Sequence, residues 1–340
     1  MKSHAAVFAV DVGYGNTKVA FRNGAEVATL IFPSLTPVHQ EQTIAIESQG
    51  LLNVPKTIPI EWEGKTYDVG PGVPLSSRNG NAGGTLADNF CTTDSYAALL
   101  GGAFHFANIE SVDRLVLGLP VKNFHKYAEH LRQAFTGKLD FGSTQVQVDK
   151  VMVLPQPIGA LVNFTKYHEF DRDNPHLIID VGYFTTDWVV ATGLTMDERR
   201  SGGHQSGASH YYQMIAERIK ARLKVAPDGI ERIDKAIREG KKYLLAGQDI
   251  DLMAYREESQ PVIDSTVKVI HNLIGHTEDL RSIVVTGGGA ALYASTIRAA
   301  FPTTRIDAMS NPSFSNVRGF FAAGEVAMMR DKQRKEGVAA

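Results

Sequence analysis

The chain carries the same short pattern twice, separated by almost half of its 340 residues. Residues 8–21 read FAVDVGYGNTKVAF and residues 177–190 read LIIDVGYFTTDWVV, an offset of 169 because 177 minus 8 is 169. The two segments agree at five of fourteen positions, four of them consecutive. Each has an apolar run, a tight turn and a second run, which predicts a β-hairpin. This repeat favours a duplicated domain over two generic Asp-Gly hairpins that arose by accident.

Length and charge narrow the class of protein. A chain of 340 residues is typical of two domains, at about 100–200 residues each. The 35 basic and 37 acidic side chains leave a net charge of −2, which excludes strong direct nucleic-acid binding through bulk charge. The single cysteine, Cys91, excludes a disulfide framework and a cysteine-based zinc site.

The compartment is expected to be the cytoplasm, with no membrane partner. The N-terminal segment MKSHAAVFAVDVG is interrupted by Asp11 too soon for a signal peptide. The longest apolar stretch, at about 97–109, contains His105 and Asn108 and is too short to span a bilayer.

Strands alternate with helices along the rest of the chain, which predicts α/β layers. Strands are expected at 113–119, 145–154 and 282–286, with a further hairpin within 61–72. Helices are expected at about 93–107, 124–135, 208–223, 229–239, 262–276 and 317–330, and also after Pro157 and after the glycine run at 287–289. Thr93 or Asp94 is the expected N-cap of the first helix. The polar tail DKQRKEG beyond Arg330 is expected to be frayed.

The first repeated hairpin has the composition of a phosphate-binding turn. Gly13 and Gly15 allow the backbone to approach an anion closely. Asn16 is polar, and Lys18 offers a compact positive charge to a phosphate oxygen. Asp11 ends the first strand, where a carboxylate can hold Mg²⁺ directly or through water.

The second hairpin repeats this composition, and a glycine run forms a third element. Asp180 and Gly182 occupy the positions of Asp11 and Gly13. Residues 185–187 add two hydroxyls and a second acid. Residues 287–289 are three glycines between an apolar strand and a helix, which allows a flat group to pass closely.

The order and spacing of these motifs resemble the actin/Hsp70/sugar-kinase ATPases. DVGYGNTK, DVGYFTTD and VTGGGA, at 11–18, 180–187 and 285–290, are similar to the phosphate-1, phosphate-2 and adenosine motifs of that superfamily. Segments 115–121 and 311–325 are similar to its two connecting motifs. The short chain, the second loop and SGGHQSGAS resemble the bacterial plasmid-segregation actins, the ParM/StbA group with its PRTRC and archaeal actin-like relatives.

The resemblance implies an α/β, actin-like ATPase fold with two duplicated RNase H-like domains flanking a nucleotide cleft. Domain I is expected at 1–158 plus 312–340, with a small subdomain at about 22–90. Domain II is expected at 159–311. Tyr183 and Phe184 depart from the family pattern, which has glycine or small residues at those positions in many members.

The resemblance also implies a role for each motif residue. Asp11 and Asp180 are expected to bind Mg²⁺ through water, and Lys18 to contact the β- and γ-phosphates. Gln156 is expected to orient the attacking water, with Asp180 beside it. The remaining nucleotide contacts are expected from Gly13, Tyr14, Gly15, Asn16, Gly182, Tyr183, Phe184, Thr185, Thr186, Gly287, Gly288 and Gly289. Glu217 and Lys220 are weaker candidates for the ribose or base.

The function implied is a filament-forming ATPase, a homopolymer that binds ATP or GTP with Mg²⁺. It would move plasmid DNA through a DNA-binding adaptor protein, without strong direct DNA binding of its own. One alternative is a small-molecule kinase, for which Asp94 and Asp113 are the acids in the expected region. Another alternative is a scaffold that binds nucleotide without hydrolysing it.

Overall fold

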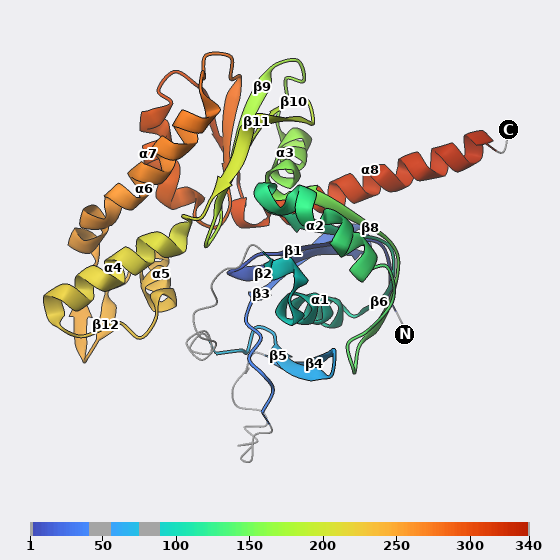
Figure 1. Cartoon of the computed structure of the whole chain (residues 1–340), viewed down its shortest axis with the longest axis horizontal. Helices are drawn as coiled ribbons and strands as arrows, with labels where there is room; N and C mark the ends of the chain where they lie inside the picture. The colour runs from blue at the N-terminus through green and yellow to red at the C-terminus, as the bar shows by residue number, and fades with distance from the viewer. Residues whose placement is uncertain (1–2, 41–55, 75–88, 339–340) are drawn as a thin grey trace. The chain divides into compact units, whose positions relative to one another are not determined.

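The computed structural model describes residues 3–40, 56–74 and 89–338. The expected small subdomain at 22–90 therefore lies partly outside the described residues. Contacts between Cα atoms divide the chain into two compact units (Figure 1). Unit 1 is Met1–Pro155 with Asn316–Ala340, and unit 2 is Gln156–Ser315.

Unit 1 contains a sheet of six strands in the order β3-β2-β1-β6-β8-β7. Their bounds are β1 Ser3–Val12, β2 Asn16–Asn23, β3 Glu26–Pro33, β6 Ile109–Leu119, β7 Gly137–Asp140 and β8 Gln145–Pro155. The first three strands are antiparallel, whereas β6 is parallel to β1 and β8 is parallel to β6. The expected hairpin within 61–72 is confirmed as β4 Ile58–Trp62 and β5 Lys65–Val69.

Unit 2 repeats this arrangement with five strands in the order β11-β10-β9-β14-β15. Their bounds are β9 Pro175–Val181, β10 Thr186–Thr192, β11 Thr195–His204, β14 Ser282–Thr286 and β15 Ile306–Ala308. Three antiparallel strands again come first, and β14 is parallel to β9. The short strands β12 Tyr243–Leu245 and β13 Gln248–Ile250 form a separate hairpin. The duplication predicted from the two hairpins is confirmed by the shared order of the strands.

Helices pack on both sheets. Unit 1 has α1 Asp94–Ala107, α2 Val121–Ala134 and α8 Ser315–Val338, and unit 2 has α3 Gln156–Tyr167, α4 Ala208–Leu223, α5 Ile230–Glu239, α6 Met253–Ile274 and α7 Ala290–Ala300. Single 3₁₀ turns lie at Phe90–Thr92 and Pro312–Phe314. In unit 1, Phe8 of β1 stacks on Phe104 of α1, with ring centroids 4.9 Å apart. None of the described helices has the length and apolar character that a membrane span requires.

Helix α8 is longer than expected from the sequence. We predicted an end near Arg330 and a frayed tail, but the helix continues to Val338. Asp331 explains the difference, because its carboxylate lies 2.8 Å from both Arg114 of β6 and Lys150 of β8. The Lys150 ammonium, above all, holds the pKa of the Asp331 carboxyl below its usual range. The polar tail is thus anchored to the sheet by ion pairs between residues far apart in the chain.

Helix α6 begins earlier than expected, at Met253 rather than near Val262. Pro261 lies inside the helix, although proline removes one backbone hydrogen bond and disfavours a helical interior. The turns before it are held by packing, because Tyr255 and Ser259 are buried in unit 2. Tertiary packing therefore outweighs the local preference to start after the proline.

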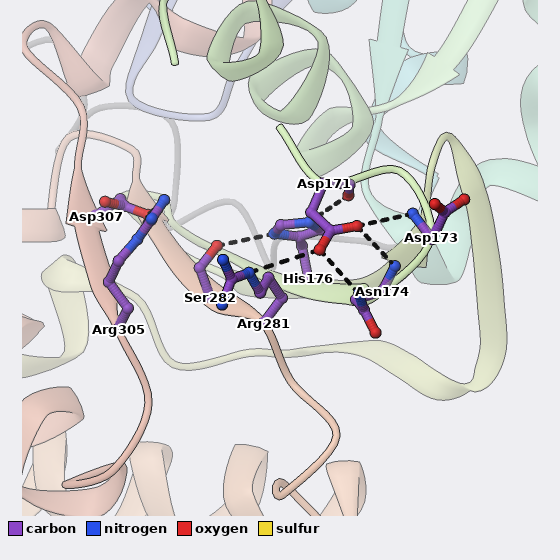
Figure 2. Close-up of polar contacts among 8 residues, drawn as sticks. All are labelled: Asp171, Asp173, Asn174, His176, Arg281, Ser282, Arg305 and Asp307. Atoms are coloured by element: carbon purple, nitrogen blue, oxygen red, sulfur yellow. Dashed lines mark hydrogen bonds and ion pairs between the residues drawn. The ribbon is translucent and has the colours of Figure 1, made fainter. Parts of the chain in front are cut away.

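A buried histidine closes the loop between α3 and β9 (Figure 2). His176 Nε2 lies 2.7 Å from the Asp171 carbonyl oxygen, and Nδ1 lies 2.8 Å from the Ser282 hydroxyl. A carbonyl can only accept, so Nε2 donates and Nδ1 accepts from Ser282, which satisfies the neutral imidazole. The Asp171 carboxylate accepts from the backbone amides of Asp173 and Asn174, an Asx turn that shapes the loop.

This histidine predicts a dependence of stability on pH. Burial lowers the pKa of His176 below its ordinary value of 6.5. The unfolded chain binds a proton near that pH while the folded chain stays neutral, so stability is lost as the pH falls below about 6.5. Urea unfolding at about pH 8 and about pH 5.5 should show a smaller loss for His176→Gln than for the wild type. Equal losses in the two proteins would contradict the prediction.

Candidate functional site

The first hairpin places an acid and a base side by side at the end of β1. Asp11 and Lys18 are directly paired across β1 and β2, so their side chains share one face of the sheet. The Lys18 ammonium lies 3.3 Å from the Asp11 carboxylate, and Asp11 is buried. This pairing orients the lysine at the strand end, next to the turn that the sequence predicts to bind phosphate.

The turn itself is tight and is held by the end of β3. A Cβ atom on Gly13 would lie 3.0 Å from the Asn16 carbonyl oxygen, closer than side-chain carbons normally approach. The backbone amide of Ser34 donates to the Gly15 carbonyl over 3.1 Å. The hydroxyls of Thr17 and Ser34 are 2.9 Å apart. The turn is therefore fixed by both its own hairpin and the neighbouring strand.

An aromatic cluster lies beside this turn. The Tyr14 ring packs on Phe90, with centroids 4.9 Å apart, and Phe90 meets the edge of Tyr96. Thr93 is confirmed as an N-cap of α1, because its hydroxyl accepts from the Tyr96 amide. Burial raises the pKa of the neighbouring Cys91 thiol to about 11, so this cysteine is protonated near neutral pH and is a poor nucleophile.

The second hairpin brings two buried carboxylates together. Asp180 and Asp187 are direct partners across β9 and β10, and they are 6% and 3% exposed. Glycines make room for both: a Cβ on Gly203 would lie 2.5 Å from Asp187 Oδ1, and a Cβ on Gly287 would overlap Asp180 Oδ1. Mg²⁺ prefers oxygen ligands and retains several waters, so this donor set fits it.

The loop between β9 and β10 is held by the start of α4. Three consecutive amides, those of residues 207–209, donate to the carbonyls of Phe184, Gly182 and Tyr183 over 2.9, 3.1 and 2.7 Å. The Gly182 amide donates to the Thr185 carbonyl over 2.8 Å, which closes the loop. A Cβ on Gly207 would lie only 2.7 Å from the Gly182 carbonyl oxygen. The loop carbonyls therefore face α4.

Tyr183 and Phe184, which depart from the family pattern, are accommodated by packing. The Tyr183 hydroxyl donates to Glu231 of α5 over 3.2 Å, and its ring meets Phe184 edge to face and lies near Tyr212 of α4. The Tyr183 ring thus packs against the helical side of unit 2, as do the loop carbonyls.

The glycine run 287–289 lies against the base of the same loop. Gly287 has φ of +89°, and its amide donates to the Pro312 carbonyl. The Gly289 amide donates to the Val181 carbonyl over 2.9 Å. The structure therefore brings the expected adenosine motif and the second phosphate loop together within unit 2.

The remaining predicted residues are placed as follows. Gln156 is the first residue of α3, a helix that packs on β9 and β10. Glu217 and Lys220 are exposed on α4.

The two acids considered for a kinase reaction are engaged elsewhere. Asp94 lies 2.7 Å from the Lys65 ammonium and accepts from the Tyr67 hydroxyl. Lys65 holds its pKa below the usual range, whereas a general base needs a pKa near neutrality. Asp113 is half-exposed and faces His4 at 3.4 Å.

The site thus divides by unit. Asp11 to Lys18 form one group in unit 1, and Gln156, residues 180–187 and the glycine run belong to unit 2. Within the described residues, no group of three or more His, Cys, Asp or Glu side chains could hold a metal by itself.

Reasoning from sequence missed residues 206–209 as the support of the second loop. Their local signals are the run of small residues before a helix and their place in SGGHQSGAS, the segment that resembles the plasmid-segregation actins.

Two family models match the chain, one in each half. Residues 9–159 match the model described as the actin-like proteins N-terminal domain. Residues 178–299 match the model described as the archaeal actin homologue MreB-like C-terminal domain. A comparison with curated proteins finds no match.

Solved structures share the fold over nearly the whole chain. Ta0583, an archaeal actin homologue, is 17% identical with a TM-score of 0.76, over 94% of this chain and 99% of that one. Its complex with ADP is 18% identical with a TM-score of 0.72, over 94% and 99%. A ParM filament from Clostridium botulinum is 19% identical with a TM-score of 0.75, over 95% and 99%. The α/β fold predicted from the sequence is confirmed by these likenesses.

Neighbouring glycines in the run should differ sharply in their tolerance of alanine. In Gly287→Ala the new methyl group would overlap the Val181 carbonyl oxygen at a left-handed φ. We expect this variant to lose about 2 kcal/mol or more of unfolding free energy. In Gly288→Ala the nearest atom is Ser313 Oγ at 3.8 Å, so the change should stay within about 0.5 kcal/mol. Urea unfolding measures both, and equal losses would refute the predicted placement of Gly287.

Proposed function

The chain belongs to the actin-like proteins, and from that premise we propose that it is an ATPase that polymerises into filaments with nucleotide bound. The observation that carries the proposal is the buried acid beside a tight glycine turn, present once in each unit. Asp11 with Gly13 and Asp180 with Gly182 repeat this geometry at the ends of equivalent strands.

The proposed ligand is ATP or GTP with Mg²⁺. Asp11 and Asp180 would hold the metal ion through water, and the ion would neutralise charge on the phosphate oxygens. Lys18 would add its ammonium to the phosphates, and the turn at 13–16 would donate backbone amides. In unit 2, residues 182–186 would wrap the γ-phosphate, and Gly287, Gly288 and Gly289 would pass beneath the adenosine. The ADP complex of the archaeal homologue supports a nucleotide ligand.

The proposed reaction is attack of water on the γ-phosphate. Phosphoryl transfer requires little covalent participation by the protein, so positioning and charge stabilisation dominate. Gln156 would orient the attacking water from the start of α3, and Asp180 would hold that water or the water on the metal. Asp180 and Asp187 are both buried at the ends of neighbouring strands, where they would offer carboxylate oxygens to a metal–nucleotide complex.

The proposed role is DNA segregation through a homopolymer. A DNA-binding adaptor protein would connect the filament to plasmid DNA, because a net charge of −2 offers no general attraction to DNA. The filament structures of ParM and Alp12, two proteins with a similar fold, support the proposal that this chain polymerises. We propose the cytoplasm as the compartment.

Sedimentation tests polymerisation. With ATP and Mg²⁺ the protein should pellet and form filaments visible by electron microscopy, whereas without nucleotide it should remain soluble. Parallel samples with GTP decide the nucleotide preference. Samples with ADP are the control for the effect of a bound nucleotide that lacks the γ-phosphate. A protein that stays monomeric with every nucleotide, at high concentration and in several salts, is not a filament former. Turnover that requires an added small-molecule acceptor would identify a kinase instead.

Two variants test the hydrolytic residues. Gln156→Ala and Asp180→Ala should each raise the barrier by about 3–4 kcal/mol, by analogy with removal of one transition-state donor. Phosphate release measures the rate, and calorimetry should show that Gln156→Ala still binds nucleotide. Asp249→Ala, at an exposed acid of β13, is the matched control. Unchanged turnover in both variants would refute the assigned roles, and nucleotide binding without turnover in the wild type would identify a scaffold.

A further inference from the structure

Behind the second phosphate loop lies a buried cluster of hydroxyl groups. Thr186 comes from β10, Ser206 from the segment before α4, Thr266 from α6 and Tyr293 from α7. All four residues are buried, with exposed fractions of 3% or less. Buried polar groups are costly unless they are paired, so a satisfied cluster of this kind fixes the elements that contribute to it.

The Ser206 carbonyl oxygen is the centre of this hydroxyl cluster. It accepts from the Thr186 hydroxyl over 2.8 Å and from the Tyr293 hydroxyl over 3.3 Å. A carbonyl oxygen has two lone pairs, so both are used. The Ser206 hydroxyl, in turn, lies 2.8 Å from that of Thr266. Burial raises the pKa of Tyr293, so its hydroxyl keeps its proton and remains a donor.

The segment that begins at Ser206 is the one that holds the loop. The amides of the next three residues, 207–209, donate to the carbonyls of residues 182–184. A shift of the Ser206 carbonyl would therefore move the three donors that set the loop backbone. Tyr293 belongs neither to the loop nor to the segment that supports it. It lies in α7, the helix that follows the glycine run 287–289.

We propose that Tyr293 is a positioning residue for the second phosphate loop, acting through the Ser206 carbonyl and Thr186. Its hydroxyl ties the helix after the glycine run to the segment that orients the loop carbonyls. Tyr293 touches no reacting group itself. The kinetic part of this inference rests on the proposed nucleotide hydrolysis, whereas the structural part does not.

Removal of one hydroxyl tests the proposal. Tyr293→Phe keeps the ring in the core and deletes the hydroxyl, with its bond to the Ser206 carbonyl and its interactions with Thr186 and Thr266. Tyr211→Phe is the matched control, because Tyr211 is also buried in unit 2 and its hydroxyl also donates to a backbone carbonyl over 3.3 Å, that of Arg256. Both variants lose one hydroxyl that donates to a backbone carbonyl, so both should show small decreases in melting temperature.

Hydrogen exchange of the nucleotide-free protein separates the two variants. In Tyr293→Phe, the amides of Gly182 and of residues 207–209 should exchange about tenfold faster than in the wild type. In Tyr211→Phe they should stay within about twofold. Equal exchange in these segments for both variants would overturn the proposal, whatever the protein's activity. This readout also stands if the wild type proves unable to hydrolyse nucleotide.

Kinetics provide the second readout. Tyr293→Phe should lower kcat about tenfold with KM for the nucleotide within about twofold, because a misplaced loop weakens contacts made in the transition state. Tyr211→Phe should leave both parameters unchanged.

If Tyr293→Phe does not fold, Thr266→Val takes its place, because it removes the hydroxyl that lies next to the Ser206 hydroxyl. Thr266→Val should speed exchange in the same segments, whereas Thr266→Ser keeps the hydroxyl and should exchange like the wild type. Thr266→Val with wild-type exchange would then refute the role of the hydroxyl cluster.

Discussion

Two buried carboxylates, Asp180 and Asp187, lie on neighbouring strands at one end of the unit 2 sheet, and glycines of the adjoining segments make room for them. Their positions are possible only because Gly203 and Gly287 carry no Cβ atom where the carboxylate oxygens lie. Carboxylate oxygens are the ligands that Mg²⁺ prefers in proteins. The arrangement is therefore suited to a ligand that brings positive charge, as a metal–nucleotide complex does. In unit 1 the acid at the equivalent strand end, Asp11, is paired with Lys18.

The second loop depends on backbone hydrogen bonds more than on its own side chains. The first amides of a helix have no partner within the helix, and in α4 the amides of residues 207–209 are satisfied by the carbonyls of residues 182–184. The loop and the helix thus complete each other. Tyr183, one of the two residues that depart from the family pattern, is accommodated because its hydroxyl bonds to α5 and its ring packs near α4.

Most elements could be predicted from local patterns. The two hairpins, the strand before the glycine run and helix α4 follow from apolar periodicity and turn residues. The errors have a common cause. Helix α6 begins before Pro261 because its first turns are buried, and α8 continues beyond Arg330 because Asp331 pairs with Arg114 and Lys150. In each case a contact with a distant segment outweighs the local signal, and a window of sequence does not contain that contact.

The sequence by itself determined the duplicated hairpins, the acids at their strand ends and the glycines of their turns, because each is specified by residues within a few positions of one another. Only the tertiary structure decided what supports those turns. Ser206 and Tyr293 are 87 positions apart, and Thr266 and Ser206 are 60 apart. Hydroxyls that far apart are brought within hydrogen-bonding distance by the packing of α6 and α7 on the sheet. That packing buries apolar area without directional preference, so no local pattern could have named these partners.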